Sequence, residues 1–86
     1  MNLEVDFHVG SRLRRRRRML GLTQRELGAA VGVRLQQVQR YECGQNSLSA
    51  PRLWAVANVL GVPIEYFFEG LQPRNVERDV AHAQGA

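Results

Sequence analysis

Residues 23–44, TQRELGAAVGVRLQQVQRYECG, carry the clearest structural pattern of the chain. This stretch divides at a glycine into two short segments, and each has the spacing of an amphipathic helix. In the first segment Leu27, Ala30 and Val31 recur at i, i+3 and i+4, which places them on one buried stripe. Gly32 then supplies the left-handed residue that commonly ends a helix. The stretch therefore predicts two helices joined by a sharp turn.

The start of the first segment carries its own helix signal. Thr23 can accept a hydrogen bond from a free backbone N–H of the first turn, and Glu26 can accept one from the Thr23 amide. This reciprocal pair is a capping box, so we expect the helix to begin directly after Thr23. The small Ala29 and Ala30 would let a neighbouring helix approach closely.

The second segment has few residues with which to join a core. Val33 can fill the turn, and only Val38 and Tyr41, three residues apart, are apolar and inward. The remaining positions face water or a ligand with mostly long polar side chains: Leu35, Gln36, Gln37, Gln39 and Arg40.

A pair of helices joined by a glycine turn matches the helix-turn-helix pattern, in which the second helix lies in the major groove of DNA. A Gln amide can accept from N6 and donate to N7 of adenine, an Arg guanidinium can donate to O6 and N7 of guanine, and Leu35 could contact a thymine methyl. Gln36, Gln37 and Arg40 share one helix face, so one groove could meet all three. An ordinary polar surface is the other interpretation, because Gln is a good helix former without any ligand.

Further helices are predicted on both sides of the stretch. Before it, Val9, Leu13 and Leu20 recur at helical spacing, which predicts a helix over residues 10–20 that Gly21 stops. After it, Ser49 caps a fourth helix with Pro51 in its first turn and a buried edge of Leu53, Val56, Ala57 and Leu60.

A fifth helix, IEYFFEG at residues 64–70, opens after Pro63. The fold class is therefore all-α, a compact five-helix bundle that contains a helix-turn-helix. We expect residues 1–8 to form an N-terminal arm and residues 9–70 the helix-turn-helix domain. Residues 71–86 are polar, so we expect a flexible or weakly helical tail.

Charge is concentrated in the middle of the chain. All 12 basic residues are Arg, and ten of them lie between residues 12 and 52 against only two Glu, a net charge of +8. Both flanks are acidic, each with a net charge of −2. This distribution indicates a polyanion footprint on one face. For the run Arg14 to Arg18 a solvated face with no partner stays open, and only those side chains that point at a duplex would contact phosphate.

Several functional classes are disfavoured by composition. An 86-residue chain buries about 60% of its unfolded surface, which leaves little room for a deep catalytic cleft. With one cysteine, Cys43, and no CxxC or HxxxH spacing, the chain offers no disulfide and no metal or cofactor site. No nucleophile and base pair or phosphate-binding loop indicates an enzyme. No apolar run approaches the roughly 18 residues of a membrane span, and the chain reads as intracellular.

The remaining residues with distinctive chemistry have structural explanations. We expect Trp54, Tyr66, Phe67 and Phe68 to be core or dimer contacts. His8 and His82 lie in the predicted tails and should be exposed without partners, and Cys43 should be a small half-buried filler.

From Val9 to Glu69 the sequence resembles the phage Cro/repressor-like, or Xre-type, helix-turn-helix regulators. The resemblance rests on VGxRLR in the first helix, GLTQxxL into the second, GV in the turn, QRYExG closing the third and LxxxAxxLGV in the fourth. It implies a bundle of five helices that binds operator DNA, commonly as a homodimer, to repress or activate transcription. It also implies a bacterial or phage-derived protein that works in the cytoplasm at the nucleoid.

The resemblance also assigns roles to individual positions. Gln24 matches a Gln that meets the DNA backbone and braces the second helix of the pair, and Arg40 matches a position that often holds phosphate, so it ranks behind Gln36 and Gln37 as a base reader. Gln45 and Asn46 match a loop that contacts phosphate. The full set of expected backbone contacts is Arg14, Arg17, Arg18, Thr23, Gln24, Arg34, Gln45 and Asn46.

Three residues depart from the family pattern. Arg34 replaces a usual cap, so we expect the third helix to lack a side-chain N-cap, at a cost of about 1 kcal/mol. Arg16 stands at a usually apolar position, so we expect its stem on the core and its guanidinium toward DNA or an acid. Leu35 replaces a polar residue, which favours an apolar base contact or a partner interaction.

The function predicted from all of this is a sequence-specific DNA-binding transcriptional regulator, a repressor that reads the major groove with residues 34–43. We expect double-stranded operator DNA and a second copy of the chain as partners, and no membrane or small-molecule ligand. The alternative is a protein-interaction module, such as an antitoxin or adaptor, that uses the outer helices and the tail.

Overall fold

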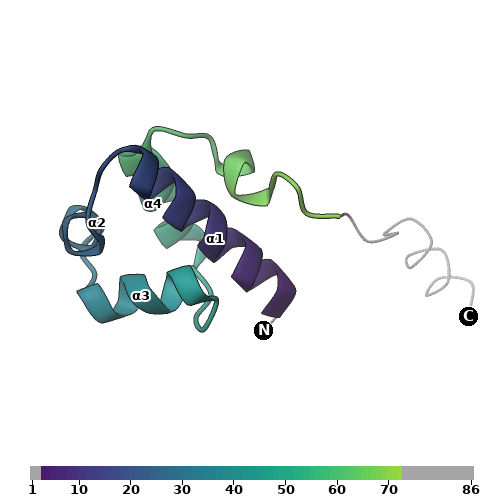
Figure 1. Ribbon diagram of the computed structural model, residues 1–86, viewed down its shortest axis with the longest axis horizontal. Coiled ribbons are helices and arrows are strands. Elements are labelled where there is room, and N and C mark those ends of the chain that lie inside the picture. Colours follow the sequence, from purple (N-terminus) through teal and green to yellow (C-terminus); the bar gives the residue numbers. More distant parts are fainter. Residues whose placement is uncertain (1–2, 73–86) are drawn as a thin grey trace, which may run out of the picture.

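The computed structural model describes residues 3–72, and all the regular secondary structure of this part of the chain is helical (Figure 1). Its elements are α1 (Leu3–Met19), α2 (Gln24–Val31), α3 (Leu35–Cys43), α4 (Ala50–Leu60) and the 3-10 helix η1 (Ile64–Phe68). No helix among these residues is long and apolar enough to cross a membrane. The expected tail lies almost entirely outside the described residues.

The all-α prediction is confirmed, but the count of five α-helices is wrong. Four α-helices are followed by a single short 3-10 helix. Its first turn closes with an i+3 hydrogen bond from Tyr66 N to Pro63 O at 3.0 Å. Only the five residues Ile64–Phe68 are helical before Gly70 takes a φ of +91°. A segment this short forms the tighter helix because the longer hydrogen-bonded turns have no room to propagate.

The predicted start of the first helix is also wrong, because α1 begins at Leu3 rather than Gly10. Residues 3–8 of the expected arm are therefore helical. Glu4 and Asp6 stand in the first turn, where acidic side chains are favoured by the helix dipole. Gly10 does not break the helix; a Cβ built there would lie 2.1 Å from the Tyr41 carbonyl oxygen, so the glycine is the place where α1 and α3 touch.

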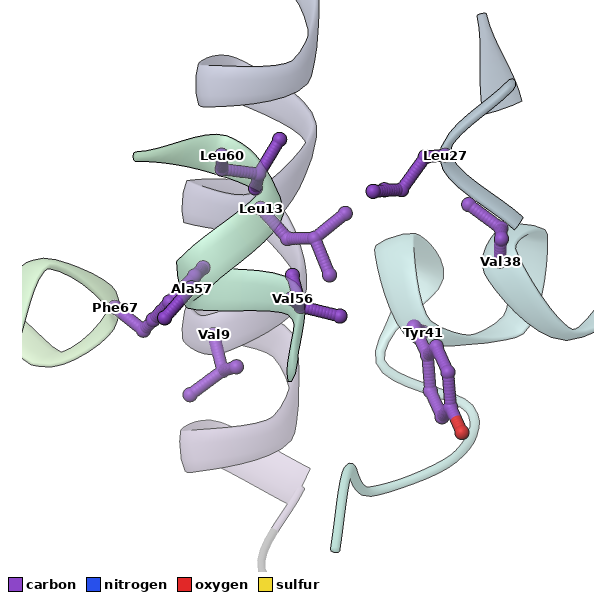
Figure 2. Packing of buried hydrophobic residues seen from close by; sticks show 9 residues of the cluster. All are labelled: Val9, Leu13, Leu27, Val38, Tyr41, Val56, Ala57, Leu60 and Phe67. Atoms are coloured by element: carbon purple, nitrogen blue, oxygen red, sulfur yellow. The ribbon is translucent and has the colours of Figure 1, made fainter. Parts of the chain in front are cut away.

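The hydrophobic core receives side chains from every element (Figure 2). Its members are Val9, Leu13, Leu27, Val38, Tyr41, Val56, Ala57, Leu60 and Phe67. Most of the residues predicted to be inward are in this set. Val31 and Leu53 are half-buried and pack against this set, whereas Leu20, which follows the last turn of α1, is 44% exposed and Ala30 is exposed on α2.

The turn between α2 and α3 forms as expected, with one correction. Gly32 ends α2 at φ 76°, and Val33 is half-buried behind it. The close approach occurs at Gly28 and not at Ala29 or Ala30, because a Cβ at Gly28 would lie 2.6 Å from the Val33 carbonyl oxygen. The α2 helix is therefore seated on the turn through a glycine.

The helix caps match the sequence-based expectation. Glu26 N donates to Thr23 Oγ1 at 3.0 Å and Thr23 N donates to Glu26 Oε1 at 2.8 Å, which completes the capping box. The backbone hydrogen bond, followed by the hydroxyl contact, lowers the pKa of the Glu26 carboxyl from its ordinary value. Ser49 caps α4 through Arg52 N at 3.2 Å. Arg34 precedes α3 without any side-chain cap, as expected.

Candidate nucleic-acid interface

The α3 helix separates an inner from an outer face. Val38, Tyr41 and Glu42 are buried, which anchors one side of the helix. Of the five side chains expected to read bases, Gln36, Gln39 and Arg40 are exposed and Leu35 and Gln37 are half-buried. The predicted base-reading residues therefore lie on the side of α3 that is not packed into the core.

A broad hollow of about 860 Å³ opens beside this outer face. It is formed by α1, by the start of α2 and by α3 with the loop that follows it. Its lining residues are Arg14, Arg17, Arg18, Leu22, Thr23, Gln24, Gln36, Gln39, Arg40, Glu42, Cys43 and Gln45. We call this hollow the basic groove. It brings together most of the predicted base and backbone contacts from three separate segments of the chain.

Of the remaining predicted contacts, Arg34, Leu35 and Gln37 lie around the first half of α3, and Asn46 lies in the loop after α3 with its Nδ2 3.3 Å from Gln37 Oε1. A second hollow of about 530 Å³ is lined by Arg34, Gln36, Gln37 and Arg40 together with Arg52 from α4. A third, smaller hollow lies between α2 and α3 and is lined by Arg25 and Leu35 among others. Polar and cationic side chains thus surround α3 on both sides of its outer face.

The floor of the basic groove is a buried ionic cluster. Arg17 donates from Nε to Glu42 Oε2 at 2.6 Å and from Nη2 to Glu42 Oε1 at 3.0 Å, a forked pair. The two side chains are only 11% and 3% exposed. Gln24 Nε2 donates to Glu42 Oε1 at 2.9 Å, and Arg17 Nη1 donates to the Leu22 carbonyl at 2.8 Å. One carboxylate therefore ties α1 and α2 to α3.

This cluster involves two residues with predicted roles, and it changes one of those roles. Gln24 braces α3 through Glu42, as the resemblance implied. Arg17 was expected to contact the DNA backbone, but its guanidinium already has a carboxylate and a carbonyl as partners, so we do not retain it among the phosphate contacts. Glu42 was missed by the sequence analysis. It stands four residues after Val38, as Arg17 stands four after Leu13, so both continue a buried stripe.

The arginine run of α1 is divided between structure and surface. Arg16 Nε donates to the Leu60 carbonyl at the end of α4 at 2.9 Å, so the expectation that it points to DNA or to an acid is wrong. Arg12 donates to the Tyr66 carbonyl and pairs with Glu69 at 2.8 Å. The exposed members of the run are Arg14, Arg15 and Arg18, and the first and last of these line the basic groove.

Two cations beside α3 were absent from the predicted site, Arg25 of the third hollow and Arg52. Arg52 lines the second hollow and donates from Nη1 to the Val31 carbonyl at the end of α2. It therefore holds the α2–α3 turn from α4, and the cation suits the negative end of the α2 dipole. A lone Arg in the first turn of a helix gives no sequence signal for such a contact.

The positions of the other residues singled out from the sequence agree only partly with the expectation. Cys43 is exposed in the basic groove rather than half-buried. His8 lies on α1 with its Nε2 2.6 Å from the Glu69 carbonyl oxygen, so it is neither in a tail nor without a partner. Trp54 is 61% exposed and does not belong to the core, whereas Phe67 is fully buried. Residues 3–72 hold no group of His, Cys, Asp and Glu side chains suited to a metal ion.

Comparison with known proteins places this arrangement among regulators. A family model described as helix-turn-helix matches residues 13–67. An uncharacterized HTH-type transcriptional regulator of Sinorhizobium medicae is 49% identical over 65 residues, which cover 76% of this chain and 47% of that protein. An uncharacterized transcriptional regulator in the ATPase CF(0) region of Rhodospirillum rubrum is 48% identical over 75 residues, 87% of this chain and 69% of that protein. The chain thus spans about half the length of the Sinorhizobium relative.

Two crystal structures share the fold. The restriction-modification controller protein C.AhdI from Aeromonas hydrophila aligns with a TM-score of 0.69 at 29% identity, over 72% of this chain and 90% of that one. The clp gene regulator ClgR from C. glutamicum aligns with a TM-score of 0.72 at 27% identity, over 79% of this chain and 96% of that one.

Proposed function

The chain belongs to the helix-turn-helix family, and we propose that it is a DNA-binding transcriptional regulator that represses by occupying operator DNA. The observation that carries the proposal is the outer face of α3. Its exposed Gln36, Gln39 and Arg40 border a groove that also presents Arg14 and Arg18, so a duplex would meet base-reading amides and cations together. In a bacterium such a protein would act in the cytoplasm, at the nucleoid.

Bases are read by α3, residues 34–43 being the recognition segment. Gln36 and Gln39 are exposed and can match adenine, while Arg40 can match guanine or hold a phosphate. Leu35 and Gln37 lie at the edge of the reading face, where Leu35 would meet a thymine methyl. The buried cluster of Arg17, Gln24 and Glu42 holds α3 against α1 and α2, and so fixes the angle at which α3 would enter the major groove.

Phosphates are held on both sides of the reading face. The proposed backbone contacts are Arg14, Arg18, Thr23, Gln24, Arg34, Gln45 and Asn46, and we add Arg52 because it lines the hollow beside Arg34. Such contacts position the helix without reading sequence. They also release counterions, so binding should weaken steeply with salt.

The first test compares the DNA upstream of the gene with shuffled DNA of equal length by fluorescence anisotropy across a salt series. Gln36→Ala should weaken binding to the natural fragment by about 1–3 kcal/mol and leave shuffled DNA nearly unchanged. Arg14→Ala should weaken both and reduce the salt slope by about 1. Arg15→Ala is the matched control, since Arg15 is exposed on the same helix but does not line the groove. Equal binding of the two DNAs by the unmodified protein would refute sequence-specific regulation.

We propose that a homodimer binds the operator, because a two-fold protein matches a two-fold site. It should prefer an inverted repeat whose half-site centres lie about one helical turn apart, and a single half-site should bind far more weakly. Whole and half sites that bind with equal affinity would contradict dimeric recognition.

A second candidate function is a protein-interaction module, such as an antitoxin or adaptor. The exposed apolar side chains favour it, since Trp54 is 61% exposed on α4 and Phe7 is 64% exposed on α1. In that case Trp54→Ser would abolish activity in a reporter strain and Gln36→Ala would not. The regulator proposal predicts the reverse order of sensitivity.

A further inference from the structure

The side chain of Gln37 differs from the other amides on α3 because it already has a partner. Asn46, in the loop after α3, donates from Nδ2 to Gln37 Oε1 at 3.3 Å, and both side chains are half-buried. The Asn46 backbone is itself tied to α3, since its N–H points to the Arg40 carbonyl oxygen at 3.4 Å. In the described part of the chain, Gln36 and Gln39 have no such side-chain hydrogen bond.

We propose that Asn46 sets the base preference of Gln37, an inference that rests on the proposed DNA-reading function. A Gln amide has an acceptor side and a donor side. A flip of the Gln37 amide alone would bring Nε2 against Asn46 Nδ2 and lose the hydrogen bond, so the Gln37 amide can turn only together with that of Asn46. The observed pairing leaves the Nε2 hydrogens of Gln37, rather than its Oε1, available to a base.

The observed orientation favours bases that offer acceptors. Guanine presents N7 and O6 and thymine presents O4 in the major groove, and each can accept from an NH₂ group. Paired reading of adenine needs an acceptor for N6 together with a donor for N7. Gln36 and Gln39 remain free to rotate into that arrangement, whereas Gln37 can turn only together with Asn46. Asn46 is thus a positioning residue that acts on sequence preference through Gln37.

The proposal predicts that the preference can be reversed from the loop. Asn46→Asp replaces the donor by a group that only accepts at neutral pH, so Gln37 must donate Nε2 to it and turn Oε1 outward. Gln37 should then favour adenine or cytosine, which present amino groups. Asn46→Ala removes the partner altogether and should leave the position degenerate.

The experiment is the selection of binding sites from randomised duplexes by the full chain, followed by affinity measurement on matched pairs of sites. The position read by Gln37 is the one that loses its preference in Gln37→Ala. At that position the unmodified protein should select guanine or thymine. Asn46→Asp should select adenine or cytosine, and Asn46→Ala should show no preference. We expect each preference to be about tenfold in affinity, within the range for one base contact.

Gln45→Asp is the matched control, because it adds the same charge in the same loop without touching Gln37. It should weaken binding to every site and leave the selected base unchanged. The inference is overturned if both Asn46 variants keep the original base at the position that Gln37→Ala erases. Selection of no sequence by the unmodified protein would instead overturn the proposed function, and the inference with it. A base identity cannot be altered by a mere loss of stability, so this readout separates positioning from folding.

Discussion

Substitution of Glu42 by Ala should destabilise the protein by about 3 kcal/mol, because it removes the carboxylate that three segments share. Breaking a buried ion pair from one side typically costs about 3–5 kcal/mol, since the remaining charge is left without its partner. The lower end of this energy range applies to Glu42 because Arg17 does not lose all its partners. Arg17 lines an open groove and keeps its hydrogen bond to the Leu22 carbonyl at 2.8 Å, so part of its charge can be solvated.

The loss can be measured by urea unfolding at 25 °C, followed by far-ultraviolet circular dichroism. For a domain of this size each kcal/mol lowers the melting temperature by about 4–8 °C, so about 3 kcal/mol corresponds to roughly 12–24 °C. The matched control is the double variant Arg17→Met with Glu42→Leu, which removes both charges and keeps apolar volume. Replacing a whole buried pair is often neutral, so this variant should stay within about 1 kcal/mol of the unmodified protein.

Two outcomes would contradict the expected role of Glu42. A loss below about 1 kcal/mol in Glu42→Ala would mean that Arg17 is hydrated rather than buried. If Arg17→Met and Glu42→Leu are also measured singly, a double variant as unstable as these two single variants added together would mean that the residues do not interact. Glu42→Gln adds a check on charge, because it keeps the shape and one acceptor oxygen for Gln24 while removing the negative charge.

Three further predictions concern single positions. Glu26→Gln should lower the melting temperature at pH 7. Because the pKa of Glu26 is lower in the folded than in the unfolded protein, the ionised carboxylate stabilises the fold above the unfolded pKa, and this stabilisation is lost as pH falls through the folded pKa. In thermal scans the difference between the two proteins should therefore shrink as the pH falls below the unfolded pKa of about 4.3 and vanish once the pH is below the folded pKa; a gap that persists at the acid limit would contradict the capping role. Gly10→Ala should cost about 3 kcal/mol or prevent folding in urea titrations, since its Cβ would meet the Tyr41 carbonyl oxygen at 2.1 Å; a stabilised variant would disprove the close contact. Phe67→Ala should cost about 3–5 kcal/mol and Phe68→Ala about 1 kcal/mol or less, because Phe67 is fully buried and Phe68 is 39% exposed; equal losses would contradict this packing.

Much of the fold could be predicted from local patterns. The stripe around Leu27, the capping box at Thr23 and the glycines that end the helices are encoded within a few residues of where they act. The missed start of α1 has a different cause. A glycine in a helix looks like a breaker in sequence, and its real reason at Gly10 is a carbonyl on α3, about 30 residues away in the chain.

The candidate site divides in the same way. Which side chains of α3 face outward follows from helix geometry and the two inward residues Val38 and Tyr41, so the reading face was predictable. The partners of Glu42, Arg52 and Asn46 were not, because each contact joins elements whose relative placement no local pattern gives. Residues near helix ends, such as Cys43, were misjudged because a small change in helix direction decides their exposure.

The opposite faces of α3 have a consequence for how such a protein diverges. The stability of the helix depends on its buried residues, while Gln36, Gln39 and Arg40 are exposed and lie outside the core. Exchanges at exposed positions usually change stability by about 0.5 kcal/mol or less. The product of a duplicated gene could therefore change the DNA sequence that it binds one substitution at a time, with every intermediate still folded.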